Sequence, residues 1–290
     1  MRIGLSTRTA RAIAAAILMA TTPAAAFADG TGTYYDRTFV LAAHEKCDLF
    51  RSSVAGALSA AALQSRGAAL RAGTAETTLQ ATANRAQSRA RSVSCANPEL
   101  ALVRDRVADA FAGWQRIPRM DFNGDRATWT ADRVRREAAS WRLVQTSVTG
   151  ASPVRFGIGA STEGRESLSA VVSFVGRPRP YAARMVMRDP ALAARPWLNA
   201  AGRAVLPPES ARQEVWSSGA APAATTLLAM GRTQGEVWTF PGAGGDRLSR
   251  LDPREPFLIE FLFRDGSVAT ATFEAGDFAA ARAFVALGTV

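Results

Sequence analysis

The spacing of the hydrophobic residues changes about midway along this chain, and this change constrains the fold more than any other feature. Between residues 34 and 114, apolar residues recur every three or four positions, as on one face of an amphipathic helix. After Trp141 they recur at every second position, which is typical of half-buried strands. We therefore predict an α+β fold, with a helical region over 29–118, a connecting segment over 119–138, and an antiparallel β region with a closing C-terminal helix over 139–290.

Three helices are expected in the helical region, the first two forming a hairpin. One apolar stripe continues from Val40 to Ala61, and Gly67 and Gly73 bracket a break after it. Thr74 is placed to cap a second helix. The run 97–99, Asn-Pro-Glu, is typical of a helix start, because asparagine caps, proline loses no hydrogen bond there, and an acid suits the positive end of the helix.

The N-terminus has the pattern of a secretory signal peptide. Three arginines and no acid precede an apolar run over residues 12–20, which as a helix spans about 14 Å, about half of a hydrocarbon core. Pro23 follows, and residues 26–28, Ala-Phe-Ala, match a cleavage site. We predict that residues 1–28 are a signal peptide cleaved near Ala28, with a buried N-terminal helix as the alternative. No later stretch reaches 18 apolar residues, so no transmembrane segment is expected in the mature chain, which would be periplasmic or secreted.

Cys47 and Cys95, the two cysteines of the chain, are expected to form a disulfide. They lie at similar distances on either side of the turn near residues 70–74, so two antiparallel helices would bring them side by side. An oxidising compartment would then favour the bond. The alternative is a redox-active pair, but such pairs usually lie close together in the sequence, as in Cys-x-x-Cys.

The net charge of +10 is carried almost entirely by arginine and is spread evenly along the chain, and residues 66–94 are the best local candidate for an anionic contact. That stretch contains a single acid, Glu76, so it could contact an anionic envelope surface, with a solvated helix face as the alternative. Aromatic residues are missing from it, which argues against nucleic acid bound by base stacking. The candidate contact residues are Arg66, Arg71, Arg85, Arg89 and Arg91.

The β region contains several candidate strands and one sharp turn signal. Asp265-Gly266 suits a two-residue type I′ turn, which would set Phe263 opposite Val268. A short helix capped by Asp277 would follow. The candidate strands are 143–148, 154–158, 168–174, 181–187, 235–240, 256–264 and 268–273.

The hairpin and short helix over residues 256–290 resemble the end of the secreted invasion-associated locus B family. The likeness covers the strand-turn-strand pattern and the stretch GDFAAARAFVAL, about an eighth of the chain. The β region has no cysteine that would support this resemblance. No functional residue is carried over from that family.

One acidic stretch matches part of a calcium-binding loop. Asp121, Asn123, Asp125 and Asp132 supply oxygen ligands at relative positions 1, 3, 5 and 12. Position 6 is Arg126 instead of glycine, and position 12 is Asp instead of the bidentate Glu. The alternative is a turn in which these side chains bond to nearby backbone.

Other catalytic and cofactor motifs are incomplete. His44, the single histidine, cannot supply a His-based zinc site by itself, and residues 159–163 lack the last glycine of a nucleophile elbow. Residues 242–245, Gly-Ala-Gly-Gly, lack the lysine of a phosphate-binding loop and predict a flexible loop. We expect no cofactor. Paired carboxylates stay open as a catalytic device.

Two functional hypotheses follow. The favoured one is a non-enzymatic binding or structural module that contacts an envelope protein or an anionic envelope surface. The alternative is a periplasmic hydrolase that acts on a glycan or peptide through two carboxylates.

Overall fold

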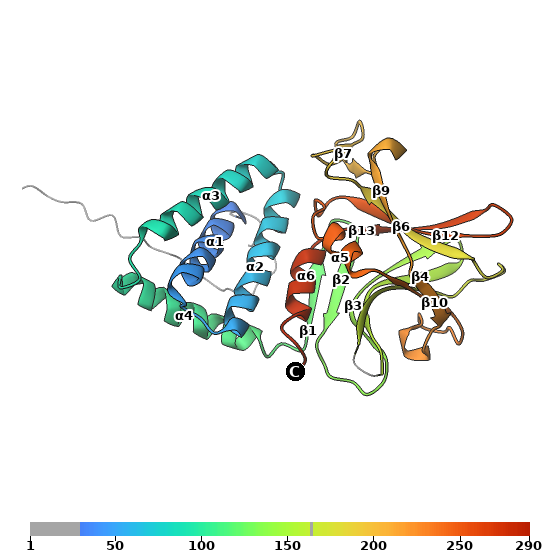
Figure 1. The fold of residues 1–290 in the computed structure, drawn as a ribbon, viewed down its shortest axis with the longest axis horizontal. Coiled ribbons are helices and arrows are strands. Elements are labelled where there is room, and N and C mark those ends of the chain that lie inside the picture. Colours follow the sequence, from blue (N-terminus) through green and yellow to red (C-terminus); the bar gives the residue numbers. More distant parts are fainter. Residues whose placement is uncertain (1–29, 163–164) are drawn as a thin grey trace, which may run out of the picture.

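The computed structural model describes residues 30–162 and 165–290, and it confirms the predicted α+β class (Figure 1). A cluster of helices comes first in the chain, and antiparallel sheets with two short α-helices follow. The predicted signal peptide lies outside the described residues. In the described part of the chain, no helix combines the length and the hydropathy needed to cross a bilayer.

The N-terminal region contains four helices where the sequence predicted three. The apolar stripe from Val40 to Ala61 is divided after Cys47, because Asp48 adopts a left-handed backbone with φ of 50°. The Nδ1 atom of His44 then accepts a hydrogen bond from Phe50 N–H at 3.1 Å, which holds the chain in its new direction. The helices are α1 (Gly30–Cys47), α2 (Ser52–Arg71), α3 (Glu76–Ser92) and α4 (Pro98–Trp114).

Two of the predicted helix boundaries differ from the structure and one agrees. Gly67 does not break the chain; it lies inside α2, where a Cβ atom would collide with Oδ1 of Asp277. Thr74 is not the cap of α3, since Ala75 occupies that position. The Asn97 cap is confirmed: its Oδ1 accepts the Glu99 N–H at 2.9 Å.

The disulfide between Cys47 and Cys95 is confirmed, with the two Cα atoms 5.5 Å apart. It joins the end of α1 to the turn after α3, and these two helices pack against each other. Beside it, Nζ of Lys46 donates hydrogen bonds to the carbonyl oxygens of Arg91 (2.8 Å) and Val93 (2.6 Å). The pairing was predicted correctly, although the helix that carries Cys47 ends there instead of continuing.

The β region consists of two main antiparallel sheets and a small two-stranded one. The larger sheet has the strand order β1-β2-β3-β4-β5-β11-β10, the second has β13-β12-β6-β9, and β7 pairs with β8. The bounds are β1 Arg119–Asn123, β2 Thr128–Asp132, β3 Ser140–Thr149, β4 Ser152–Ala160, β5 Glu166–Val172, β6 Ala182–Arg188, β7 Trp197–Leu198, β8 Ala204–Val205, β9 Arg212–Trp216, β10 Gly219–Pro222, β11 Glu236–Phe240, β12 Pro256–Leu262 and β13 Val268–Glu274, with short 3-10 turns η1 (Glu209–Ala211) and η2 (Thr225–Leu227).

The main core contains side chains from both large sheets. Phe156 of β4 lies at its centre, with ring centroids 5.3 Å from Phe257 and 5.6 Å from Phe273. Core residues alternate with outward-facing ones along β12, as half-buried strands require.

The hairpin between β12 and β13 has a different register from the one predicted. Leu262, and not Phe263, lies opposite Val268. Phe263 N–H donates to the Ser267 carbonyl at 3.0 Å, and Gly266 has a left-handed φ of 82°, so the turn is one residue longer than a type I′ turn. A shift of one residue exchanges the two faces of a strand, and it places small alanines opposite Phe261 and Ile259 in the core.

The segment 119–138, expected as a connection, contains two strands of the larger sheet, β1 and β2. Their buried residues are Phe122, Trp129 and Ala131, and most of the neighbouring positions are polar. Trp129 is fully buried, and its Nε1 donates to the Ala275 carbonyl at 2.9 Å.

Helix α6 (Phe278–Val285) lies between the two halves of the molecule (Figure 1). One side of it contacts α2, and the other contacts β1, β2 and β3. Asp277 was expected to cap this helix, but its side chain makes no capping bond. It accepts two hydrogen bonds from Arg71 of α2, at 2.5 and 2.9 Å, because a buried carboxylate is stabilised by a bidentate cation.

The glycine-rich run 242–245, expected as a flexible loop, begins helix α5 (Gly242–Leu248). Gly244 is buried, and a Cβ atom there would lie 2.9 Å from Cε of Met185. The glycine therefore permits close packing of the helix on the sheet.

Candidate functional site

The five arginines of the predicted anionic contact do not form one free surface. Arg66 pairs with Glu76 at 2.6 Å, and Arg71 is used inside the molecule by Asp277. Arg85, Arg89 and Arg91 are exposed on α3. Three of the five positions are thus available to a partner.

The four calcium candidates lie on a β-hairpin. Asp121 and Asn123 accept hydrogen bonds from Thr130 (2.8 Å) and Thr128 (3.1 Å) across the hairpin. Asp132 pairs with Arg119 and Arg136, and Asp125 lies in the turn. Within residues 30–162 and 165–290, no group of three or more His, Cys, Asp or Glu side chains is placed to hold a metal ion.

A cleft of about 600 Å³ opens on the outer face of the larger sheet, between residues 132–140 and η2. We call it the Arg155 cleft. Its floor is made by β3 and β4, and its walls carry polar and cationic groups. The lining residues are Thr130, Asp132, Arg135, Arg136, Glu137, Ala138, Ala139, Ser140, Trp141, Val144, Arg155 and Thr226.

Arg155 is the central cation of this cleft. It comes from β4, where its neighbours Val154 and Phe156 point into the core and it points out. Its guanidinium lies 5.4 Å from the centroid of the Trp141 ring, a cation–π contact. Burial lowers the pKa of Arg155 below its ordinary value, although the group stays charged at neutral pH.

The wall beside Arg155 is held by hydrogen bonds to η2 and the residue after it. The Leu227 carbonyl accepts from Trp141 Nε1 at 3.0 Å and from Arg155 Nη1 at 3.1 Å, and the Leu228 carbonyl accepts from Nη1 at 3.0 Å. Thr226 donates to the Ala139 carbonyl at 2.5 Å. These bonds hold the cleft wall in a fixed position, so that a ligand would bind at a small cost of ordering.

The carboxylates of the Arg155 cleft are poorly suited to proton transfer. Burial raises the pKa of Asp132, but hydrogen bonds from Arg136 and the Val134 N–H outweigh it and bring the pKa below its ordinary value. Asp132 is therefore ionised at neutral pH and bound to Arg119 and Arg136. Glu137, the second acid, is exposed at the rim.

A second cleft, of about 490 Å³, contains one carboxylate, Glu236. Burial raises the pKa of Glu236, and the nearby Arg179 and Trp238 offset the shift only in part. Arg177 and Arg179 line the same cleft. One acid with a raised pKa and no second carboxylate in the lining does not make a glycosidase pair.

The raised pKa of Glu236 predicts a pH effect on stability. A carboxyl group whose pKa is higher in the folded state stabilises the fold below its unfolded pKa, and this stabilisation is lost as the pH rises through the folded pKa. Relative to Glu236→Gln, the wild type should lose free energy of unfolding between about pH 4 and pH 7. Urea unfolding at both pH values tests this, with Glu209→Gln at an exposed position as the control. If the difference in the free energy of unfolding between the wild type and Glu236→Gln is the same at both pH values, the prediction is wrong.

A small apolar cavity of about 150 Å³ lies among α1, α3 and α4. Phe39, Val40, Leu100 and Val103 line it, and Arg89 lies at the same cavity. Its size is close to that of one aromatic ring, so it suits a small apolar group more than a polymer.

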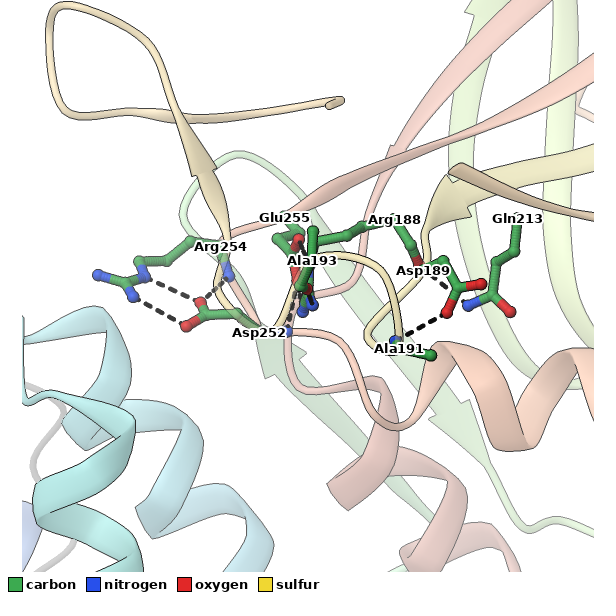
Figure 2. Close-up of polar contacts among 8 residues, drawn as sticks. All are labelled: Arg188, Asp189, Ala191, Ala193, Gln213, Asp252, Arg254 and Glu255. Carbon is green, nitrogen blue, oxygen red and sulfur yellow. Dashed lines mark hydrogen bonds and ion pairs between the residues drawn. The ribbon is translucent and has the colours of Figure 1, made fainter. Parts of the chain in front are cut away.

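The buried polar network around Arg188 and Glu255 is structural. Figure 2 shows Arg188 and Glu255 paired, with Asp252 and Arg254 beside them. Glu255 Oε1 accepts from Arg188 Nε at 2.5 Å, and Oε2 accepts from Arg188 Nη2 and from Asp252 N–H, both at 2.8 Å. Both oxygens are already used, so this pair fixes the turn at 252–255 to the end of β6.

The sequence indicated neither cleft. Trp141, Arg155 and Thr226 are up to 85 positions apart, and only the fold brings them together. The one local signal was Arg155 itself, a charged residue within an alternating strand. Comparisons with protein-family models, with curated proteins and with solved structures find no match to this chain, and the family resemblance of residues 256–290 stays a prediction.

Proposed function

We propose that the protein is a non-enzymatic binding module of the cell envelope that holds its ligand in the Arg155 cleft. The observation that carries this proposal is a half-buried guanidinium at the floor of a pre-formed cleft. Cavities of roughly 300–1,000 Å³ with a few converging polar groups are typical of small-molecule sites. The Arg155 cleft, at about 600 Å³, lies within that range.

The chemistry of the two clefts favours binding over hydrolysis by paired carboxylates. Such hydrolysis needs one acid with a raised pKa and a second carboxylate about 5 to 9.5 Å away. Asp132 has a lowered pKa and two arginine partners. Glu236 has the raised pKa, but its cleft has no second acid in its lining.

Blocking the Arg155 cleft should strongly weaken binding to the envelope. Ala138 is exposed at the cleft, so Ala138→Trp fills it without disturbing the core. We expect at least about a tenfold loss of cosedimentation with envelope fractions from the native cells, since a blocked site loses most of its contacts. Ala200→Trp, at an exposed position outside this lining, is the matched control and should bind like the wild type.

Two results would contradict the proposal. Equal cosedimentation of wild type and Ala138→Trp would place the binding elsewhere. Turnover of a glycan or peptide library by the wild type, lost in Ala138→Trp, would identify a hydrolase instead. The export that the proposal includes is checked in the same preparation, because the purified chain should then begin at Asp29.

A further inference from the structure

The guanidinium of Arg155 has hydrogen-bonding capacity that the protein leaves unused. Its Nη1 donates to two carbonyl oxygens, while Nε and Nη2 have no acceptor among residues 30–162 and 165–290. Arg133 also lacks an ion-paired carboxylate in the described part of the chain. All three of its guanidinium nitrogens, however, donate hydrogen bonds to backbone carbonyls, those of Gln115, Ile117, Leu287 and Gly288. The two residues differ in what surrounds them: Arg133 is 2% exposed, whereas Arg155 lines a cleft.

Several arginines removed from solvent have a carboxylate partner: buried Arg142 pairs with Glu166, and half-buried Arg184 pairs with Glu214 and Glu260. Arg37, Arg212 and Arg232 are half-buried and, like Arg155, donate to backbone carbonyls instead, but none of these three lines the Arg155 cleft. No ion pair joins Arg155 to an acid in the described ranges. Partial burial of a cation without a counterion costs desolvation free energy. A ligand that supplies the counterion would offset this free energy when it binds.

The free edge of Arg155 matches a planar oxyanion. The Nε–Nη2 edge of a guanidinium presents two parallel donors, a geometry that fits the two oxygens of a carboxylate. The guanidinium lies over the Trp141 ring, 5.4 Å from its centroid, and its Nη1 is held by two carbonyl oxygens. Arg135, exposed in the same lining, adds a second cation, and Ser140 adds a hydroxyl group.

We propose that the Arg155 cleft binds a carboxylate group of a small ligand, bidentately through Nε and Nη2 of Arg155. This proposal rests on the proposed function and specifies the ligand. The cleft volume of about 600 Å³ is enough for roughly a few sugar rings or about two to three residues of peptide. The carboxylate could belong to an acidic sugar or to a peptide terminus, and the experiment separates these sources.

The test titrates the full mature chain with defined probes and follows the indole ¹⁵N–¹H signal of Trp141, assigned through Trp141→Phe. The acidic probes are glucuronate and alanylalanine, and their neutral counterparts are glucose and alanylalanine amide. We expect saturable shifts with at least one acidic probe and none with the neutral ones. A response to glucuronate alone indicates an acidic glycan, and a response to alanylalanine alone indicates a peptide terminus. Both outcomes support the proposal.

The variants separate ligand contact from cleft structure. Arg155→Lys keeps a charge but loses the two parallel donors, so the affinity for the responding probe should fall about tenfold or more. Arg135→Gln leaves the wall bonds intact and should weaken binding several-fold. Arg106→Gln removes an exposed charge on α4 and should leave the affinity unchanged.

Three results would overturn the proposal. The first is an equal shift of the Trp141 signal with acidic and neutral probes, and the second is that inorganic phosphate binds but neither carboxylate probe does. The third is an unchanged affinity for the acidic probe in both Arg155→Lys and Arg135→Gln. These failures differ from a failure of the proposed function. If Ala138→Trp blocks envelope binding and no carboxylate binds, the cleft is a site for another ligand. If carboxylates bind but Ala138→Trp has no effect on the envelope, the envelope contact lies elsewhere.

Discussion

Replacing Glu255 with glutamine should lower the free energy of unfolding by about 3–5 kcal/mol, the typical cost of breaking a buried ion pair. Arg188 and Glu255 are 4% and 2% exposed, and they share two parallel hydrogen bonds (Figure 2). Glutamine has nearly the same shape but no charge, so the Arg188 guanidinium would be left buried and uncompensated. Urea unfolding followed by circular dichroism measures the change.

Two further variants control this experiment. Arg188→Met with Glu255→Leu removes both charges, so it should be less destabilised than Glu255→Gln. Asp246→Asn breaks the ion pair with Arg282 at the surface, where the Asp246 side chain is 60% exposed and the Arg282 side chain is 38% exposed. This variant should lower the free energy of unfolding by only about 0–1 kcal/mol. A loss below about 1 kcal/mol in Glu255→Gln would contradict the structural role given to this pair.

Removing the disulfide should lower the free energy of unfolding by about 4 kcal/mol. The reason is that the unfolded chain gains entropy when the crosslink between cysteines 48 positions apart is lost. Cys47→Ser with Cys95→Ser is the variant, and α1 should be the helix most affected. Of its 18 residues only Val40 and Ala43 are fully buried, so few apolar contacts replace the crosslink. The unfolding midpoint and hydrogen exchange of α1 amides measure both effects.

The oxidation state provides the control for that variant. Wild type treated with a reductant should unfold at the same midpoint as the double serine variant, because both lack the same crosslink. An unchanged midpoint in both would show that the helix contacts suffice without it. Unequal midpoints would show that the serines disturb packing on their own.

The sequence predicted those parts of the fold in which local pattern and tertiary burial agree. Strands β3 to β5 were found because two-residue alternation continues over many positions, as in Val154, Phe156 and Ile158. The Asn97 cap was found because its hydrogen bond reaches only two residues along the chain.

The errors arose where the local pattern is too short or too ambiguous to decide the conformation, or where a distant contact decides it. The break after Cys47 depends on the backbone of Asp48 and the ring of His44, and the apolar stripe passes over both. Strands β1 and β2 bury few residues each, so their alternation is too short to distinguish from a loop. Asp277 has the side chain of a cap, but Arg71, 206 positions away, takes its carboxylate.

The candidate site could not be predicted for the same reason. Its cation, its aromatic partner and its covering turn come from β4, β3 and η2, and no spacing along the chain relates them. The arginines that the sequence did single out, on α2 and α3, include two that serve internal pairs.

The position of α6 has a consequence for how the chain must be made. Phe278 and Phe284 of this helix contact Trp129 and Phe122 of the sheet, at ring-centroid distances of 5.0 and 5.7 Å. This helix follows β1 and β2 by more than 140 residues in the sequence, so it is synthesised well after them, and until it docks the aromatic face of β1 and β2 lacks its cover. A nascent chain that stops before residue 278 would expose these rings and would rely on a chaperone to keep it from aggregating.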